Sequence, residues 1–139
     1  MKTAFLRGRE HQQIGGVALE GLGPAAVALS RGGARKTYDH TDPNEDCAAL
    51  AVGAGGALVI AADGHHGELG SEAAVAAILA ELAPRLTAAS APTTSPDAWR
   101  ELAFDALLLA NRAVLEVAGR TKLPPAPTTL VLALARPAE

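Results

Sequence analysis

The sequence contains one cysteine, Cys47, and few aromatic residues, which make up 3% of its 139 residues. A single cysteine excludes a disulfide within the chain and is typical of proteins that fold in a reducing compartment. The net charge is −3, and few rings are present to stack on bases. We therefore expect no nucleic-acid partner, because such partners require basic patches or stacking platforms.

Long hydrophobic runs are also missing. The apolar runs, such as residues 57–62, fall far short of the roughly 20 residues that cross a bilayer. The first residues, MKTAFLRGREHQQ, lack the apolar core of a signal peptide. These absences predict a cytoplasmic protein with no membrane partner.

Small apolar residues are abundant. The sequence is 49% hydrophobic, which excludes a disordered chain, and its length allows one domain. Because much of this content is alanine, we expect a core with few large side chains. Residues 1–24 are polar and rich in glycine and predict a loose N-terminal segment, whereas residues 25–139 carry the domain.

Short apolar segments predict strands. Residues 25–30 read as one strand, and a polar loop of residues 31–46 follows it. Residues 47–52 and 57–62 flank a glycine-rich turn at 53–56 and predict a hairpin. A nucleotide-binding glycine loop is excluded, because its third glycine would stand where the chain has Leu58.

Two helices and a last strand complete the pattern. Ser71 is expected to cap a helix over residues 72–82, which Pro84 should end or kink. Ser95 should cap a second helix, which runs to about Ala118 and buries an apolar stripe. The stripe comprises Trp99, Leu102, Ala106, Leu109, Ala113 and Val117. Residues 128–135 predict a buried strand, so the class is α+β, with helices and strands segregated.

Acidic residues flank the predicted hairpin. Asn44, Glu45 and Asp46 precede its first strand, and Asp63, followed by Gly64, comes after its second. Antiparallel pairing brings Asp46 and Asp63 close together, which costs energy unless a cation neutralises them. Carboxylate and carbonyl oxygens suit Mg²⁺ and Mn²⁺, and glycine can turn its carbonyl toward an ion. The alternative is a plain Asp-Gly turn beside a solvated acidic loop.

Together these motifs resemble the N-terminal half of the type 2C metal-dependent protein Ser/Thr phosphatases (PPM family). The resemblance rests on an NED acid pair at 44–46, a strand ending in DGHHG at 63–67, two helices and a TTLV strand at 128–131. It covers residues from about 25 to 135. It implies a partial four-layer αββα sandwich of antiparallel sheets flanked by helices, and a phosphoserine or phosphothreonine protein as substrate.

The resemblance also implies roles for single residues. Asp63 would bridge two Mn²⁺ or Mg²⁺ ions, and the Gly64 carbonyl would bind one of them. Glu45 and Asp46 would serve the second ion, and His65 would be a general acid for the leaving oxygen. Metal-activated water is the nucleophile in this chemistry, so Cys47 need not be one, and its apolar surroundings predict a buried structural thiol.

The chain also departs from the family pattern. Thr41 stands where many members have a phosphate-binding arginine, so Arg35 or Lys36 is the candidate for substrate phosphate. After Gly67 no acidic residue follows a strand in an Asp-Gly or Asp-Asn context, so a binuclear site cannot be completed. We therefore expect either an incomplete catalytic domain or a non-catalytic module that binds a partner protein or one divalent cation.

Overall fold

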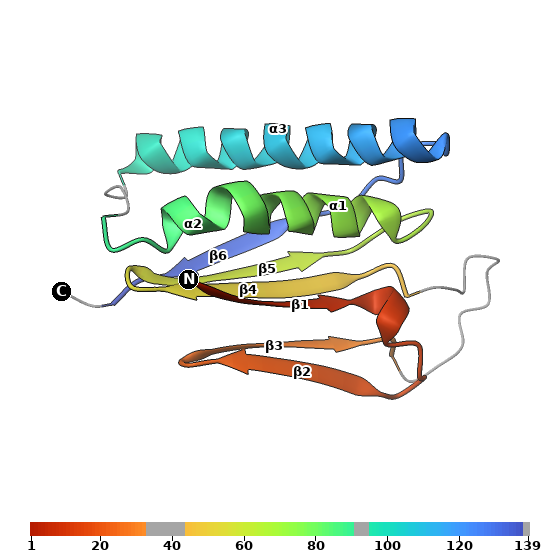
Figure 1. The fold of residues 1–139 in the computed structure, drawn as a ribbon, viewed down its shortest axis with the longest axis horizontal. Coiled ribbons are helices and arrows are strands. Elements are labelled where there is room, and N and C mark those ends of the chain that lie inside the picture. Colours follow the sequence, from red (N-terminus) through yellow and green to blue (C-terminus); the bar gives the residue numbers. More distant parts are fainter. Residues whose placement is uncertain (33–43, 91–94, 138–139) are drawn as a thin grey trace.

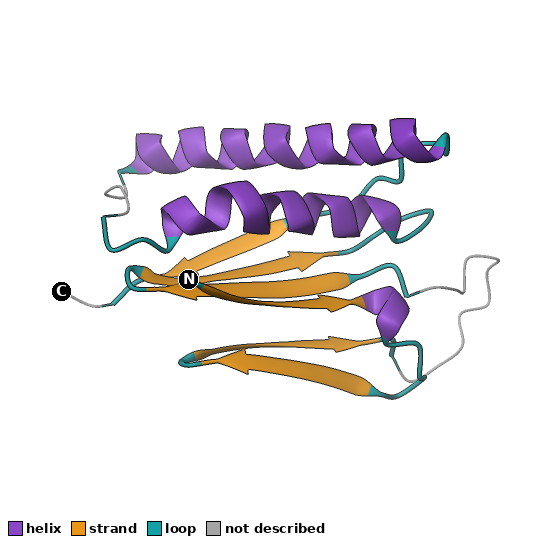
Figure 2. Cartoon of the chain, viewed as in Figure 1, coloured by secondary structure: helices purple, strands orange, loops and turns teal. Residues whose placement is uncertain are grey.

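The computed structural model describes residues 1–32, 44–90 and 95–137. These residues form two antiparallel sheets and a layer of helices (Figures 1 and 2). The strands are β1 (Lys2–Arg7), β2 (Val17–Leu22), β3 (Ala25–Ser30), β4 (Cys47–Gly53), β5 (Gly56–Ala62) and β6 (Val131–Ala135). The helices are η1 (Gly8–Glu10), α1 (Leu69–Ala77), the π-helical η2 (Ile78–Leu82), α2 (Ala83–Leu86) and α3 (Pro96–Thr121).

The larger sheet has the order β1-β4-β5-β6, and the smaller one pairs β2 with β3. Both the predicted strand at 25–30 and the predicted hairpin are confirmed. Gly53 pairs with Gly56, so the hairpin turn has only two residues, Ala54 and Gly55. Gly56 adopts a φ of 145°, which explains why the turn needs a glycine there.

Two apolar layers hold the elements together. The helices cover one face of the larger sheet, where Leu58, Ile60, Val75 and Ile78 are buried. The β2–β3 sheet covers part of the opposite face, where a second cluster forms around Leu50. The class is therefore α+β, as predicted, with antiparallel sheets and helices on one side. No helix in the described part of the chain is long and apolar enough to cross a membrane.

The expectation of a loose segment over residues 1–24 is wrong. This segment contains β1, which pairs along its whole length with β4, and β2, which pairs with β3. Phe5 packs against the helix-side cluster, whereas Leu6 is buried between the sheets. A six-residue strand that contributes to both apolar layers has too little sequence to display a clear period, which is why its pattern did not predict a strand.

The first helical segment differs from prediction at both ends. It begins at Leu69, so Ser71 lies inside the helix, fully buried, and its hydroxyl donates to the carbonyl oxygens of Glu45 and Glu68. Pro84 does not end the helix, which runs on to Leu86. The π-helical turn η2 precedes the proline, and such a turn accommodates a residue that has no N–H to donate.

The second helix starts as predicted. The Ser95 hydroxyl accepts a hydrogen bond from the Ala98 N–H at 3.1 Å, as an N-cap should. The helix continues to Thr121 and ends where Lys122 adopts the left-handed conformation. Its buried stripe consists of small residues, namely Ala106, Ala110, Val114 and Ala118. The prediction that Trp99 is core is wrong, because 39% of it is exposed.

The last strand is shorter and less buried than predicted. It forms at Val131–Ala135 and lies at the edge of the larger sheet, where Val131 is 62% exposed. Leu132 and Leu134 pack toward the helices, but the residues that alternate with them along the strand are exposed. An apolar strand is fully buried only when both of its faces are covered, and here one face is open.

Candidate metal centre

The β4–β5 hairpin brings the two candidate aspartates together. Its register pairs Cys47 with Ala62, so Asp46 and Asp63 are the next positions on the two strands. Opposed residues on neighbouring strands project from the same face, with Cβ atoms roughly 5 Å apart. The predicted meeting of Asp46 and Asp63 is therefore confirmed at the level of the backbone register.

The period of the strands places both aspartates on the side of the sheet that faces β2 and β3. Asp46 alternates with Ala48 and Leu50, which belong to the cluster between the two sheets. Asp63 likewise alternates with Val59, which packs against the same cluster. The candidate site thus lies at one end of the space between the sheets.

Gly64 allows two chain segments to approach closely. A Cβ atom at this position would lie 2.3 Å from the Glu45 carbonyl oxygen, so no larger residue fits without a backbone shift. Gly64 and Thr128 form an isolated bridge, flanked by hydrogen bonds between His65 and Pro127 and between Thr129 and Asp63. In this pattern the Gly64 N–H and C=O point away from Thr128, toward the Glu45 side.

The backbone of Asp63 is held by the segment that precedes β6. Its carbonyl oxygen accepts hydrogen bonds from the Thr129 N–H (3.0 Å) and the Thr128 hydroxyl (2.8 Å). Its N–H donates to the Thr129 hydroxyl oxygen at 3.2 Å. The residue itself is exposed, so its carboxylate is presented to solvent from an anchored backbone.

Glu45 is connected to the DGHHG turn. One oxygen of its carboxylate accepts a hydrogen bond from the Gly67 N–H at 2.7 Å. Asn44 is buried beside it, and its side-chain oxygen accepts from the Asp46 N–H at 3.4 Å. The Glu45 carboxylate therefore supports the turn that follows Asp63, which favours an indirect role for it at a metal site.

The two histidines of the turn differ in backbone conformation. His65 is exposed, and its N–H donates to the Pro127 carbonyl oxygen at 2.9 Å. His66 adopts a positive φ of 63°, which is uncommon for a residue with a side chain. The two rings lie edge to face with centroids 4.4 Å apart. The His65 imidazole is thus free of burial and can reach a ligand at the end of the hairpin.

Two arginines that sequence reasoning missed, Arg7 and Arg9, flank Gly8, whose backbone contacts Asp46, and their side chains pair with Glu72 of α1. Gly8 donates its N–H to the Asp46 carbonyl oxygen at 2.8 Å, so its neighbours Arg7 and Arg9 are brought to this end of the sheet. The Arg9 guanidinium lies 2.9 Å from a carboxylate oxygen of Glu72. Burial raises the pKa of Glu72, and Arg9 partly offsets this effect. Only the pairing of β1 with β4 could have revealed these arginines, and the N-terminal sequence does not display that pairing.

The predicted phosphate-binding residues, Arg35 and Lys36, lie outside the described residues.

The prediction that Cys47 is a buried thiol is confirmed, since the residue is 2% exposed. Burial raises the pKa of the Cys47 thiol, and the hydrogen bond between the thiol and Ser71 lowers it by less. A protonated, buried thiol cannot act as a nucleophile.

The donor set is limited but suited to a hard cation. Asp46 and Asp63 hold opposed positions at the end of the hairpin, and Gly64 follows Asp63 directly, so two carboxylates and one backbone carbonyl belong to the same end of the sheet. Within residues 1–32, 44–90 and 95–137, no three His, Cys, Asp or Glu side chains gather in a way that could hold a metal ion. Mg²⁺ commonly uses one or two carboxylates and completes its shell with water or substrate phosphate.

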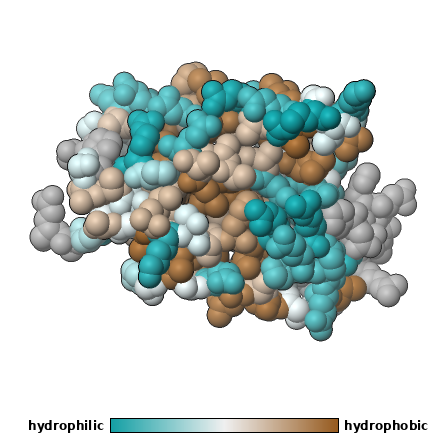
Figure 3. Space-filling model, in the orientation of Figure 1, coloured by the Kyte–Doolittle hydropathy of each residue, from teal (hydrophilic) through white to brown (hydrophobic). Residues whose placement is uncertain are grey.

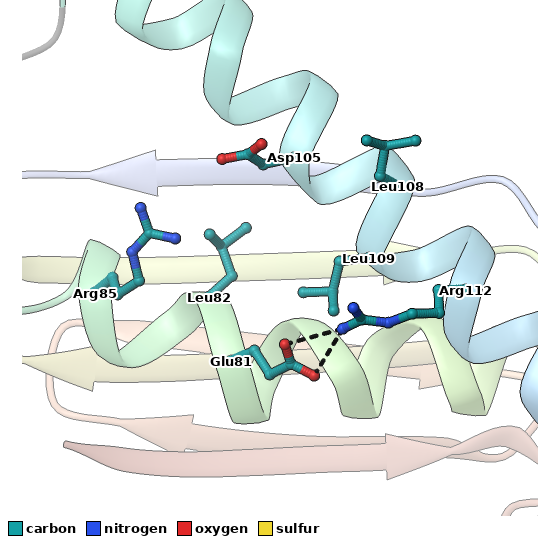
Figure 4. A pocket seen from close by; sticks show the side chains of 7 residues that line it. All are labelled: Glu81, Leu82, Arg85, Asp105, Leu108, Leu109 and Arg112. Carbon is teal, nitrogen blue, oxygen red and sulfur yellow. Dashed lines mark hydrogen bonds and ion pairs between the residues drawn. The ribbon is translucent and has the colours of Figure 1, made fainter.

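Two hollows open on the surface of the described residues. One lies between the helices and carries Glu81, Arg85, Asp105 and Arg112 (Figure 4). Arg112 is paired with Glu81 at 3.2 Å, and leucines lie between the charges, so this hollow is a groove of ordinary helix packing. The other adjoins the DGHHG turn at His66 and is walled mainly by apolar residues of 117–126.

Comparison with known proteins gives no family. No family model, no curated protein and no solved structure matches this chain.

Proposed function

We propose that this chain carries the metal-binding hairpin of a metal-dependent phosphatase that hydrolyses phosphoserine or phosphothreonine in proteins. The observation that carries the proposal is the pairing of Cys47 with Ala62, which makes Asp46 and Asp63 neighbours at the end of the sheet. The layers support a fold of the type 2C kind, since helices, a four-stranded sheet and a second sheet correspond to three of the four αββα layers.

The donor chemistry fits Mg²⁺ or Mn²⁺. Asp46 and Asp63 would supply carboxylate oxygens, and Gly64, whose C=O is directed to the Glu45 side of the hairpin, would supply a backbone carbonyl. When bound, such an ion neutralises charge on the phosphoryl group and lowers the pKa of the attacking water. Thr128 and Thr129 hold the Asp63 backbone, so they position its carboxylate for this role.

The remaining roles follow from exposure and position. His65 would donate a proton to the leaving oxygen, because imidazole transfers protons readily near neutral pH and this side chain is exposed beside Asp63. Glu45 would act on the cation through water, since one of its oxygens already accepts the Gly67 N–H. Arg35 or Lys36 would bind the substrate phosphate.

A second candidate is a non-catalytic module that binds one divalent cation. This candidate is favoured because the register brings two aspartates to one end of the hairpin, while no group of three possible ligand side chains forms in the described part of the chain. Phosphoryl transfer by two ions requires more ligands than these residues offer.

Mn²⁺-dependent hydrolysis of an aryl phosphate and of a phosphopeptide separates the two candidates. For an enzyme, Asp63→Ala should lower the rate by about 100-fold or more, because a direct ligand is removed. Asp105→Ala is the matched control, since it removes an exposed carboxylate from α3. Mn²⁺ binding without hydrolysis in the wild type would favour the module, and hydrolysis that survives Asp63→Ala would contradict the mechanism.

A further inference from the structure

The backbone of Asp46 is held by the turn that follows β1. Gly8 donates its N–H to the Asp46 carbonyl oxygen at 2.8 Å. A Cβ atom at Gly8 would overlap this oxygen and the carbonyl oxygen of Asn44, so the two segments can approach this closely only at a glycine. The Asp46 N–H donates to the side-chain oxygen of Asn44, within its own segment, at 3.4 Å. The bond from Gly8 therefore ties the Asp46 backbone to η1.

Gln12 joins the same two segments a second time. Its side-chain nitrogen donates to the Gly8 carbonyl oxygen at 3.2 Å, and its side-chain oxygen accepts the Asn44 N–H at 3.1 Å. Residues 8–12 and 44–46 are thus connected on both sides of Glu45. A movement of η1 would carry the Asp46 backbone with it.

The η1 turn needs an anchor, because little in its own structure fixes it. The ladder between β1 and β4 ends at the pairing of Arg7 with Cys47, directly before η1. The turn has three residues, and its N-cap residue makes no side-chain hydrogen bond. Short turns of this kind also have poorer hydrogen-bond geometry than α-helices. Contacts from outside the turn must therefore hold it in place.

Glu72 of α1 provides these contacts. Its carboxylate oxygens lie 2.9 Å from Arg9 Nε and 3.8 Å from Arg7 Nε. The two arginines flank Gly8, so one carboxylate holds both neighbours of the residue that bonds to Asp46. The Glu72 side chain is only 12% exposed, which limits the screening of these ion pairs. Hydrophilic side chains gather over the turn after β1 in Figure 3, at the end of the sheet where α1 begins in Figure 1.

The first turn of α1 also holds the residue before Asp46. Ser71, which precedes Glu72, donates its hydroxyl to the Glu45 carbonyl oxygen. Two consecutive residues of α1 thus support two consecutive residues of the NED motif, Ser71 directly and Glu72 through η1. The start of α1 is therefore the common support of residues 45 and 46.

We propose that Glu72 is a positioning residue for Asp46 and acts through the η1 turn. This inference rests on the proposed function, in which Asp46 and Asp63 bind a divalent cation. The Asp63 backbone is held by the segment before β6, so each candidate ligand has a separate support on its own side of the hairpin. An ion pair with no such role would stabilise the fold and leave the cation affinity of the folded protein unchanged.

Mn²⁺ titration calorimetry and amide exchange without metal test the proposal together. Glu72→Gln keeps the side-chain volume and removes the charge that holds the arginines. It should weaken Mn²⁺ binding by about tenfold, the lower end of the range for residues that orient a ligand. In the metal-free protein, the Gly8 N–H should exchange about tenfold faster, because its bond to Asp46 opens more often. Glu68→Gln is the matched control, since it removes an equal charge one helical turn earlier, and it should change neither quantity.

Arg9→Gln separates positioning from the effect of charge alone. Loss of a positive charge near the site would by itself strengthen cation binding. Loss of the anchor should instead weaken Mn²⁺ binding by about tenfold, as in Glu72→Gln. The double variant should bind little worse than either single variant, because both substitutions break the same contact.

The outcomes distinguish this proposal from the proposed function. A folded Glu72→Gln variant with wild-type Mn²⁺ affinity or wild-type exchange at Gly8 would overturn the positioning role and leave the cation site in place. Tighter binding by Arg9→Gln, or an equal loss in Glu68→Gln, would also overturn it, because charge alone would then explain the effect. A wild type that binds no Mn²⁺ would contradict the cation site itself, and the role of Glu72 would fall with it.

Discussion

Gly64 shows at the scale of one residue how the fold constrains the site. The position directly follows Asp63, and its missing Cβ lets the DGHHG turn contact the backbone at Glu45. The candidate ligands on the two sides of the hairpin depend on this contact for their spacing. The glycine is therefore needed for packing, whether or not its carbonyl binds a cation.

Gly64→Ala should lower the free energy of unfolding by about 2 kcal/mol, because its Cβ would meet the Glu45 carbonyl oxygen and force the backbone apart. Gly119→Ala is the control. It lies within α3 with open space around it, and alanine there should stabilise the protein by about 1 kcal/mol. Urea unfolding measures both changes, and a Gly64→Ala variant as stable as the wild type would refute the close contact.

Cys47 yields a prediction about reactivity. Burial raises the pKa of its thiol, so a group that already titrates above neutral pH stays protonated in the folded protein at neutral pH. Iodoacetamide should label it about 100-fold or more slowly in the folded protein than in urea, since labelling requires opening. Cys47→Ala should retain any Mn²⁺-dependent hydrolysis. Fast labelling of the folded protein would show that the thiol is accessible.

At the scale of elements, the site depends on three strands. The β4–β5 hairpin sets Asp46 beside Asp63, and the segment before β6 holds the Asp63 backbone through Thr128 and Thr129. Thr128, in the segment before β6, is 65 residues from Asp63 in the sequence. A change at the start of β6 should therefore affect cation binding without removing any ligand.

Thr128→Val combined with Thr129→Val removes two hydroxyl contacts to Asp63 while it keeps side-chain volume. We expect a loss of about 1 to 2 kcal/mol in stability and about a tenfold loss in Mn²⁺ affinity, as for other residues that orient a ligand. Thr121→Val is the matched control, because its hydroxyl bonds to the Val117 carbonyl oxygen in α3. If both variants retain full Mn²⁺ affinity, these threonines do not position Asp63.

The elements that the sequence predicts well are those with local signals. The hairpin has two apolar runs and a glycine turn, and Ser95 caps α3 as its sequence indicates. The failures arise from tertiary contacts. Ser71 lies within the helix and not at its cap, because its hydroxyl donates a hydrogen bond to the Glu45 carbonyl oxygen. The segment of β1 forms a strand because it pairs with β4. The position of Asp63 opposite Asp46 was predictable from the hairpin. The positions of Arg7 and Arg9 were not, because they depend on the pairing of β1 with β4.

At the scale of the whole molecule, the layers explain where the site lies. Helices cover one face of the larger sheet, and β2 and β3 cover part of the other. Asp46 and Asp63 alternate along their strands with residues of the cluster around Leu50, between the two sheets. They therefore place two carboxylates at one end of the apolar layer between the sheets. A cation bound by both carboxylates would join the two strands of the hairpin.

Calorimetric titration with Mn²⁺ tests the central claim, which is that Asp46 and Asp63 together bind a divalent cation. The account predicts saturable binding by the wild type and by Asp105→Asn. It predicts that Asp46→Asn and Asp63→Asn each weaken binding by about 100-fold or more, because a ligand that loses its charge binds a hard cation poorly. Absence of binding by the wild type, or equal affinity in Asp63→Asn, would contradict it.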